Sequence, residues 1–246
     1  GLIRGTMSDQ VMLSGPHRDE IPVPIAKPVL YFHRAGAGAL TVEVGVRIAN
    51  GRLVEHWPLG EAREDGLTWR DVSVEEGACA GSRYPTDAEP PCDGVHAPDA
   101  CEAVTLATVE TDDASCLRVG GEAFAHLFYR GEIRGAPSLP LTIAREGTAL
   151  RLTPTGDAAI PGSVIRIRRS TREVSVVEAP APGSAGVALP PPWAPGRTGA
   201  EALAAALRAA GLTDAEVLAF RRAWDEELFG ADVAAGVGRG IGTDVG

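Results

Sequence analysis

The sequence predicts a mainly β protein, an antiparallel β-sandwich-like domain that carries a helical hairpin at its C-terminal end. Residues 40–48, "LTVEVGVRI", alternate strictly between apolar and polar side chains, which is the period of a strand with one buried face. Roughly eight short β-rich segments are separated by glycine and proline turns, a pattern typical of a sandwich or barrel-like sheet. Over 198–230 the apolar period becomes that of amphipathic helices.

Each predicted strand has its own signal. The strand 40–48 is expected to bury one row of side chains, Leu40, Val42, Val44, Val46 and Ile48. Asn50-Gly51 is the strongest short hairpin turn, so the chain should return as a strand over 53–57. Single strands are further expected over 28–32, 67–75 and 122–133, and hairpins over 139–154, turning at Glu146-Gly147, and over 163–179, turning near Ser170-Thr171.

Composition divides the chain into five parts. The β domain is expected over 27–179, with a cysteine-containing loop over 79–116 whose second half holds a short helix. An extended, proline-spaced lead-in precedes this domain over 1–26, and a proline-rich linker follows over 180–197. The helical hairpin covers 198–230, and a glycine-rich tail expected to be disordered covers 231–246.

The two predicted helices carry explicit start and stop signals. Thr198 with Glu201, and Thr213 with Glu216, have the spacing of capping boxes, and Gly211 ends the first helix. An apolar seam is expected from five residues, Leu203, Leu207, Val217, Phe220 and Trp224. A hairpin of this size buries little core alone, so it should dock on the β domain.

Charge and hydropathy bound the partners. The formal net charge is −10, and no block of lysine and arginine stands against it, which disfavours nucleic acid and anionic membranes. No apolar run approaches the roughly 20 residues of a membrane-spanning helix, and no signal peptide is visible at the start. We expect an unknown protein or small-molecule ligand, and no cofactor.

The four cysteines are Cys79, Cys92, Cys101 and Cys116. Their spacing lacks the close ligand pairs of structural zinc sites, so a mixed zinc site with His96 is disfavoured, and the aspartates of the loop lack the spacing of a calcium loop. Two disulfides fit better. Three pairings are possible, and Cys79–Cys92 with Cys101–Cys116 is the slightly preferred one. Disulfides indicate an oxidising compartment, hence an exported protein.

The remaining candidate chemistry is sparse. No two of the five histidines have helical ligand spacing, and no nucleophile elbow, zincin or Walker motif occurs. The run "GVGRGIG" at 236–242 does not follow a strand, so it is not read as a dinucleotide loop. Four arginines gather around one predicted hairpin and are candidates for binding a carboxylate or phosphate, although a solvated strand face is favoured: Arg166, Arg168, Arg169 and Arg172.

Three segments resemble an uncharacterised group of bacterial β-rich proteins. "KPVLYFHR" at 27–34 is similar to the opening of that group, "HLFYRGE" at 126–132 to a later segment, and "GLTDAEVLAFRRAW" at 211–224 to its closing helix. The order of the three segments is the same. The chain departs from the group at His33-Arg34 and in its long cysteine insertion. The resemblance implies no activity and no catalytic residues.

The sequence therefore favours a non-enzymatic, exported bacterial binding or interaction module. The alternative is a hydrolase-type enzyme with a cleft between the β domain and the helical hairpin, using His56, His126 and the carboxylates around Asp71. A third interpretation is a cytoplasmic protein with free thiols.

Overall fold

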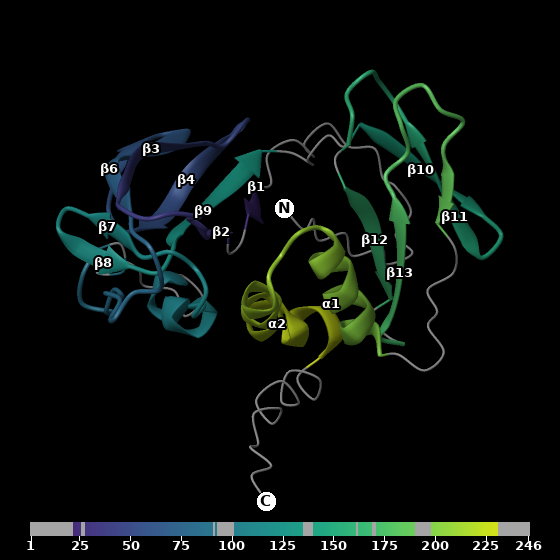
Figure 1. The fold of residues 1–246 in the computed structure, drawn as a ribbon. Coiled ribbons are helices and arrows are strands. Elements are labelled where there is room, and N and C mark those ends of the chain that lie inside the picture. Colours follow the sequence, from purple (N-terminus) through teal and green to yellow (C-terminus); the bar gives the residue numbers. More distant parts are fainter. Residues whose placement is uncertain are drawn as a thin grey trace, which may run out of the picture. The chain divides into compact units, whose positions relative to one another are not determined.

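A computed structural model of the chain confirms the predicted fold class, with antiparallel sheets followed by two C-terminal helices (Figure 1). The structure describes residues 22–25, 28–90, 92, 101–134, 140–160, 162–168, 171–189 and 198–230. The predicted tail and most of the predicted lead-in lie outside these residues. The described chain divides into two compact units, 1–137 and 138–246, and the boundary falls within the β domain predicted over 27–179.

Unit 1 contains two sheets. In the first, β9 (Leu127–Arg134) pairs on one side with β4 (Gly51–Trp57) and on the other with β1 (Pro22–Ile25) and β2 (Val29–Leu30). In the second, β6 (Gly66–Val74) pairs with β3 (Leu40–Arg47) on one side and with β5 (Glu61–Arg63) and β7 (Leu117–Val119) on the other, and β8 (Glu122–Phe124) extends the sheet beyond β7. Of the predicted strand 28–32, only β2 forms.

The predicted hairpin between 40–48 and 53–57 is wrong. Asn50 does adopt a left-handed turn conformation with φ 55°, but β3 pairs with β6 whereas β4 pairs with β9. The Ile48 N–H donates to the Asp65 carbonyl and the Leu53 N–H donates to the Glu64 carbonyl. The backbone on both sides of the Asn50-Gly51 turn therefore bonds the β5–β6 turn rather than forming a hairpin with itself. The Asn50-Gly51 turn therefore passes the chain from one sheet to the other.

The two sheets of unit 1 share an aromatic core. The Trp57 ring on β4 meets the Phe124 ring on β8 with centroids 6.0 Å apart, and the indole N–H of Trp69 on β6 donates to the Pro58 carbonyl. The predicted strand 122–133 supplies both sheets, because the chain breaks at Ala125-His126 into β8 and β9. The prediction of one continuous strand there is wrong.

The alternation predicted for 40–48 is confirmed. Val42, Val44 and Val46 are half-buried and Ile48 is buried, whereas the intervening residues are exposed. Leu40 is the exception, since it is exposed at the end of the strand. The burial of this face increases along β3 toward Ile48.

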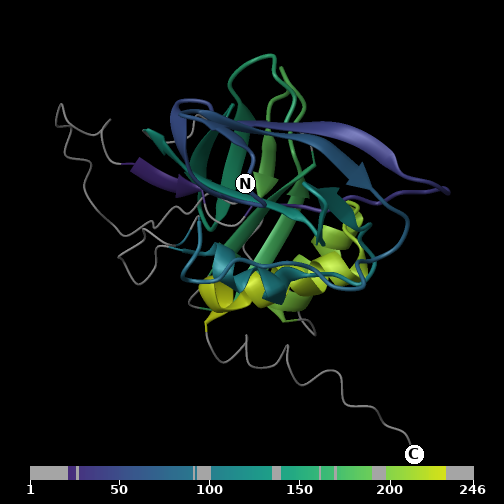
Figure 2. The same cartoon turned by 90° about the vertical axis from the view of Figure 1, so that its left-hand side faces the viewer.

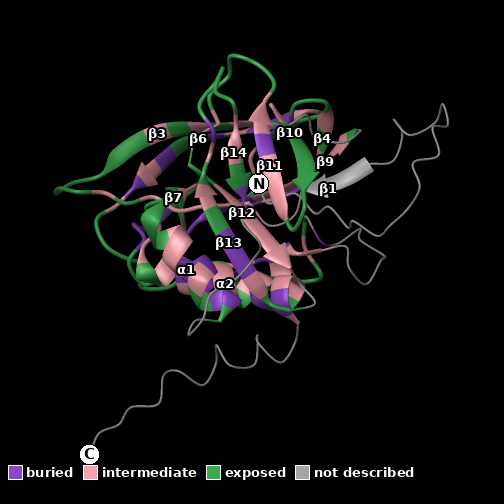
Figure 3. Cartoon of the chain, turned by 90° about the vertical axis from the view of Figure 1, so that its right-hand side faces the viewer, coloured by how far each residue is buried: buried purple, intermediate pink, exposed green. Residues whose placement is uncertain are grey.

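Unit 2 contains two smaller sheets, and both predicted hairpins are confirmed. β10 (Leu141–Glu146) turns at Gly147 into β11 (Ala149–Pro154), and β12 (Ser163–Arg168) returns as β13 (Glu173–Glu178). Within the predicted linker 180–197, Val187–Leu189 forms β14 and pairs with β11. Residues 190–197 of that linker lie outside the described residues. Figure 3 shows buried positions in β13 and the mostly exposed β10.

Helices α1 (Gly199–Ala209) and α2 (Asp214–Phe229) begin at the predicted capping boxes. The Thr198 hydroxyl accepts from the Glu201 N–H, the Thr213 hydroxyl accepts from the Glu216 N–H, and each glutamate accepts in return from the threonine N–H. These reciprocal bonds satisfy backbone groups that a helix leaves open at its start.

The helices pack on the β12–β13 hairpin, as expected of a pair that cannot bury a core alone (Figures 1 and 2). A cluster of Val174, Leu203 and Phe229 joins the two helices to β13, with Ile165 and Ile167 of β12 packed against it. Within the predicted seam, Leu203 and Val217 are buried and the other three residues are half-buried.

Candidate functional site

The four cysteines form two disulfides, so the stapled loop is confirmed, but the preferred pairing is wrong. The bonds are Cys79–Cys116 and Cys92–Cys101. Backbone pairing explains the first bond: the Cys116 N–H donates to the Gly77 carbonyl, and the Glu75 N–H donates to the Cys116 carbonyl. The end of the loop therefore lies beside its beginning, with the Cα atoms of Cys79 and Cys116 4.6 Å apart, so Cys116 bonds Cys79 rather than Cys101.

A buried carboxylate fastens this loop to the sheet. Glu55 of β4 faces inward between Leu53 and Trp57, and its Oε1 accepts from the N–H groups of Glu102 (3.0 Å) and Ala103 (2.9 Å). These residues open the 3-10 helix Ala103–Val109, which has no capping side chain of its own. Glu55 therefore caps that helix from another strand.

Arg130 of β9 completes this anchor. Its Nη2 donates to Glu55 Oε2 at 2.7 Å, and the two residues are directly opposed in the β4–β9 register. Burial raises the pKa of the Glu55 carboxyl, while the Arg130 charge and the Ala103 N–H act in the opposite direction. The pair joins strand to strand and sheet to loop.

The segment 82–84 of the stapled loop presents its side chains alternately to two environments. Arg83 lies over the Trp57 ring, 5.1 Å from guanidinium carbon to centroid, while its own carbonyl accepts from the Trp57 indole N–H. Ser82 points the other way and donates to Glu110. This short segment therefore contributes Arg83 to a surface groove and Ser82 to a polar cluster in the interior, and both are described below.

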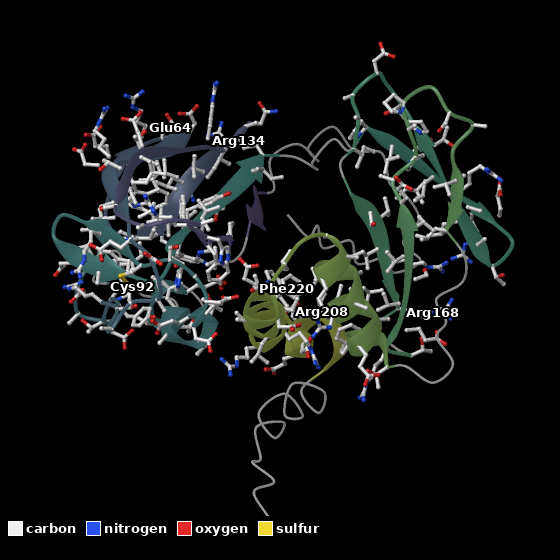
Figure 4. All side chains as sticks on the ribbon, viewed as in Figure 1. Glu64, Cys92, Arg134, Arg168, Arg208 and Phe220 are labelled. Atoms are coloured by element: carbon white, nitrogen blue, oxygen red, sulfur yellow. A yellow bond between two sulfur atoms is a disulfide. The ribbon has the colours of Figure 1, made fainter. Side chains whose placement is uncertain are left out.

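The groove beside Arg83 has a volume of about 330 Å³. Three segments of unit 1 line it: the cis-linked Trp57-Pro58 with Leu59, the stapled loop with Arg83, Glu89 and Pro90, and the β7–β8 hairpin with Val119, Gly120, Glu122 and Phe124. Figure 4 labels Cys92 in the neighbouring part of the loop. Leu59 is the conspicuous apolar residue here, because 52% of it is exposed.

The charges of the groove centre on Arg83. Its guanidinium pairs with Glu89 at 2.9 Å and with Glu122 at 3.0 Å while it covers Trp57. An aromatic face with two carboxylates is a cation-binding arrangement, which the protein's own arginine fills. The second carboxylate leaves the lining with one excess negative charge.

The interior cluster surrounds His126, which the sequence analysis named for the hydrolase alternative. The His126 ring meets Tyr31 edge-on at 5.8 Å and lies 6.2 Å from Tyr84. Burial lowers the pKa of His126 to about 4, although Glu110 acts in the opposite direction. Its Nδ1 is buried without a hydrogen-bond partner among the described residues. His126 is therefore a neutral, packed histidine at pH 7.

The other residues of the hydrolase alternative are not assembled around a histidine. Asp71 is exposed on β6 with φ 51°, and across the described residues no hydrogen bond or ion pair links it to His56 or His126. His56 packs edge-on against Trp69, and burial lowers its pKa. Ser82 donates to Glu110 rather than to a histidine, so it does not form a serine–histidine pair.

The predicted anion-binding arginines are separated by the hairpin. Arg166 and Arg168 lie on β12, Arg172 adopts φ 56° in the turn, and Arg169 lies outside the described residues. Arg168 pairs with Glu173 across the hairpin at 3.3 Å. Figure 4 labels Arg168 at the end of β12.

Comparisons with known proteins identified no relatives: no family model, curated protein or solved structure matched the chain. Among the described residues, no three histidine, cysteine or acidic side chains gather in a way that would hold a metal ion. In the same residues, no helix has the length and apolar character needed to cross a membrane.

Sequence reasoning missed the groove and the Glu55 anchor. The groove is assembled from three separate segments, at 57–59, 83–90 and 119–124, and no local sequence pattern indicates that they meet. Glu55 had a usable signal, since it occupies an inward position between Leu53 and Trp57 in an alternating strand. A charge at such a position is expected to have a buried partner.

Proposed function

We propose that this chain is an exported bacterial binding module and that the groove of unit 1 binds an extended peptide carrying one cationic side chain among apolar ones. The observation that carries this proposal is the charge arrangement at Arg83, a single guanidinium shared by two carboxylates above an aromatic ring. The resemblance to bacterial β-rich proteins supports the bacterial origin, and the two disulfides support export.

The shape and lining of the groove suit such a peptide. Its volume of about 330 Å³ is at the low end for ligand pockets, which fits one or two side chains rather than a large cofactor. Leu59, Pro90 and Val119 offer apolar surface beside the acidic groups. A peptide would lay its apolar side chains on these residues, which gives affinity, and its cation on the carboxylates, which gives orientation.

Glu122 is the carboxylate that remains most available. Its side chain is 55% exposed although Arg83 contacts it, compared with 29% for Glu89. An arriving arginine or lysine can therefore pair with the outer side of Glu122 without displacing Arg83 from Trp57. Arg83 would remain over the Trp57 ring and paired with both carboxylates.

The disulfides suit a binding role in a second way. Cys79, which is bonded to Cys116, lies four residues before Arg83. Cys92, which is bonded to Cys101, lies two residues after Pro90. The wall of the groove is thus covalently fixed near both ends. A fixed wall lowers the ordering cost of binding, which is how rigid loops gain affinity.

Fluorescence anisotropy with two labelled pentapeptides, Leu-Pro-Arg-Leu-Pro and Leu-Pro-Glu-Leu-Pro, tests the proposal on the full chain. We expect saturable binding of the arginine peptide and at least ~5-fold weaker binding of the glutamate peptide, the effect of about 1 kcal/mol at a partly exposed ion pair. Absence of saturable binding, or equal binding of both peptides, would contradict the proposal.

Matched variants locate the site. Glu122→Gln should lower the affinity for the arginine peptide ~3-fold, as expected for the loss of one charge at the rim of the groove. Leu59→Ser should lower the affinity for both peptides. Glu76→Gln removes the same charge from an exposed position outside the groove and should change neither affinity. Equal effects of Glu122→Gln and Glu76→Gln would show that only net charge matters.

A further inference from the structure

The β12–β13 hairpin of unit 2 presents two different faces. Ile165 and Ile167 of β12 pack on the hydrophobic cluster of the helices. Because side chains alternate along a strand, Arg166 and Arg168 lie on the opposite face. Because the isoleucine face is packed against the helices, the side chains of Arg166 and Arg168 extend from the opposite side of the hairpin.

The β10–β11 turn approaches this second face. Arg166 Nη1 donates to the Thr148 carbonyl at 3.4 Å, which places the end of β10 beside β12. Arg145 occupies that end of β10, opposite Leu150 in the hairpin register. Burial lowers the pKa of the half-buried Arg166, and the positive charges of Arg168 and Arg145 lower it further. Arg145 of one hairpin and Arg168 of the other therefore both lie close enough to Arg166 for their positive charges to act on its guanidinium group.

The nearby carboxylates neutralise only Arg168 among these three arginines. Glu146 is held by Arg151 at 2.6 Å. Glu173 pairs with Arg168 at 3.3 Å and also accepts from the Thr171 hydroxyl at 2.6 Å. In the described parts of unit 2, neither Arg145 nor Arg166 forms an ion pair with a carboxylate. Four arginines and two carboxylates leave an excess of two positive charges in a chain whose net charge is −10.

We propose that Arg145, Arg166 and Arg168 form an oxyanion-binding site between the β12–β13 hairpin and the β10–β11 turn, which takes a phosphate or carboxylate group of a ligand. Guanidinium groups donate in pairs to such oxygens, and an anion between them would offset their mutual repulsion. This site lies in unit 2 and is independent of the peptide groove in unit 1. The arginine pattern of the sequence indicated part of it, whereas Arg145 is added by the fold.

The probes are inorganic phosphate and acetate, titrated separately into the full chain at constant ionic strength, with binding read by isothermal calorimetry. We expect saturable binding of at least one of the two anions. Tighter binding of phosphate would assign a tetrahedral oxyanion, and tighter binding of acetate would assign a carboxylate ligand. Failure of both anions to saturate the protein would overturn the proposal.

Three variants separate a built site from general charge. Arg166→Gln should lower the affinity for the anion ~10-fold, which is the effect of losing a pair of charge-assisted hydrogen bonds. Arg145→Gln, at an exposed position that carries no fold risk, should weaken it ~3-fold or more. Arg208→Gln removes an exposed arginine of α1 and should leave the affinity within ~2-fold of the parent. Equal weakening by Arg208→Gln and Arg145→Gln would overturn the site.

Discussion

Glu55 and Arg130 oppose each other across β4 and β9 and form an ion pair of 2.7 Å whose side chains are only 2% and 14% exposed. The same carboxylate caps the 3-10 helix of the stapled loop through Glu102 and Ala103. A single side chain therefore connects both strands with the loop that walls the groove. Removing it takes the 2.7 Å carboxylate partner from the buried Arg130 guanidinium, which still faces Glu102 at 4.0 Å, and takes the carboxylate acceptor from the N–H groups of Glu102 and Ala103.

Glu55→Ala should lower the free energy of unfolding by about 3–5 kcal/mol, the usual effect of breaking one side of a buried pair. Glu132→Ala is the matched control, because Glu132 pairs with Arg52 on the same two strands at a similar distance but at the surface. That variant should cost about 1 kcal/mol or less. Urea denaturation measures both, and similar losses would contradict the anchoring role of Glu55.

His126 should make the fold sensitive to mild acid. Its pKa is 6.5 in an ordinary setting and about 4 in the folded chain. Between pH 6.5 and 4 the unfolded chain binds a proton that the folded chain refuses, so stability falls as the pH falls through this window. The shift corresponds to about 3 kcal/mol at full extent.

His126→Phe keeps the aromatic contact with Tyr31 and removes the titration. The stability of this variant should therefore fall less than that of the parent between pH 6.5 and 4 in denaturation curves. A parent-like slope in His126→Phe would refute the assignment.

The disulfide pairing is directly testable by mass spectrometry of unreduced protein. Digestion with trypsin and a glutamate-specific protease cuts at Arg83, Glu102 and Glu110, which separates the peptides around Cys79 and Cys116 from the others. We expect the peptide with Cys79 to be linked to the peptide with Cys116, and a single further peptide, ending at Glu102, to carry an internal disulfide between Cys92 and Cys101. A link between Cys79 and Cys92, or four free thiols in protein from an oxidising compartment, would contradict the structure.

Gly199 should resist substitution although alanine is the better helix former. A Cβ there would collide with the Arg172 carbonyl, where α1 begins beside the β12–β13 turn. Gly199→Ala should therefore destabilise unit 2 by about 1–3 kcal/mol despite its gain in propensity. Gly156→Ala, where a Cβ meets open space, should be neutral or slightly stabilising in the same thermal melts.

Local features of this fold were predictable and long-range ones were not. The Thr198 and Thr213 capping boxes, the alternation of 40–48 and the two hairpins of unit 2 depend on residues a few positions apart. The Asn50-Gly51 turn was correctly recognised, but its strands joined different sheets because β6 and β9 compete for them. Turn chemistry sets the reversal of the chain, whereas pairing depends on the whole core.

The candidate sites show the same division. The four cysteines and part of the arginine set were visible in the sequence. The pairing of Cys79 with Cys116 required the backbone contact at Gly77, and Arg145 joined Arg166 through the approach of another hairpin. Arg83 lacked any sequence signal, since its function depends on a tryptophan 26 residues earlier.

Hydrogen–deuterium exchange of the full chain, with and without the Leu-Pro-Arg-Leu-Pro peptide, tests the binding role of the groove most directly. Exchange reports opening at each backbone amide, so protection maps the contact surface. We predict slowed exchange at the groove-lining amides, which are those of Leu59, Arg83, Glu89, Val119, Gly120 and Glu122, and unchanged exchange in the β10–β11 hairpin of unit 2. Unchanged exchange throughout unit 1 at saturating peptide, or protection only in unit 2, would contradict a peptide-binding groove at Arg83.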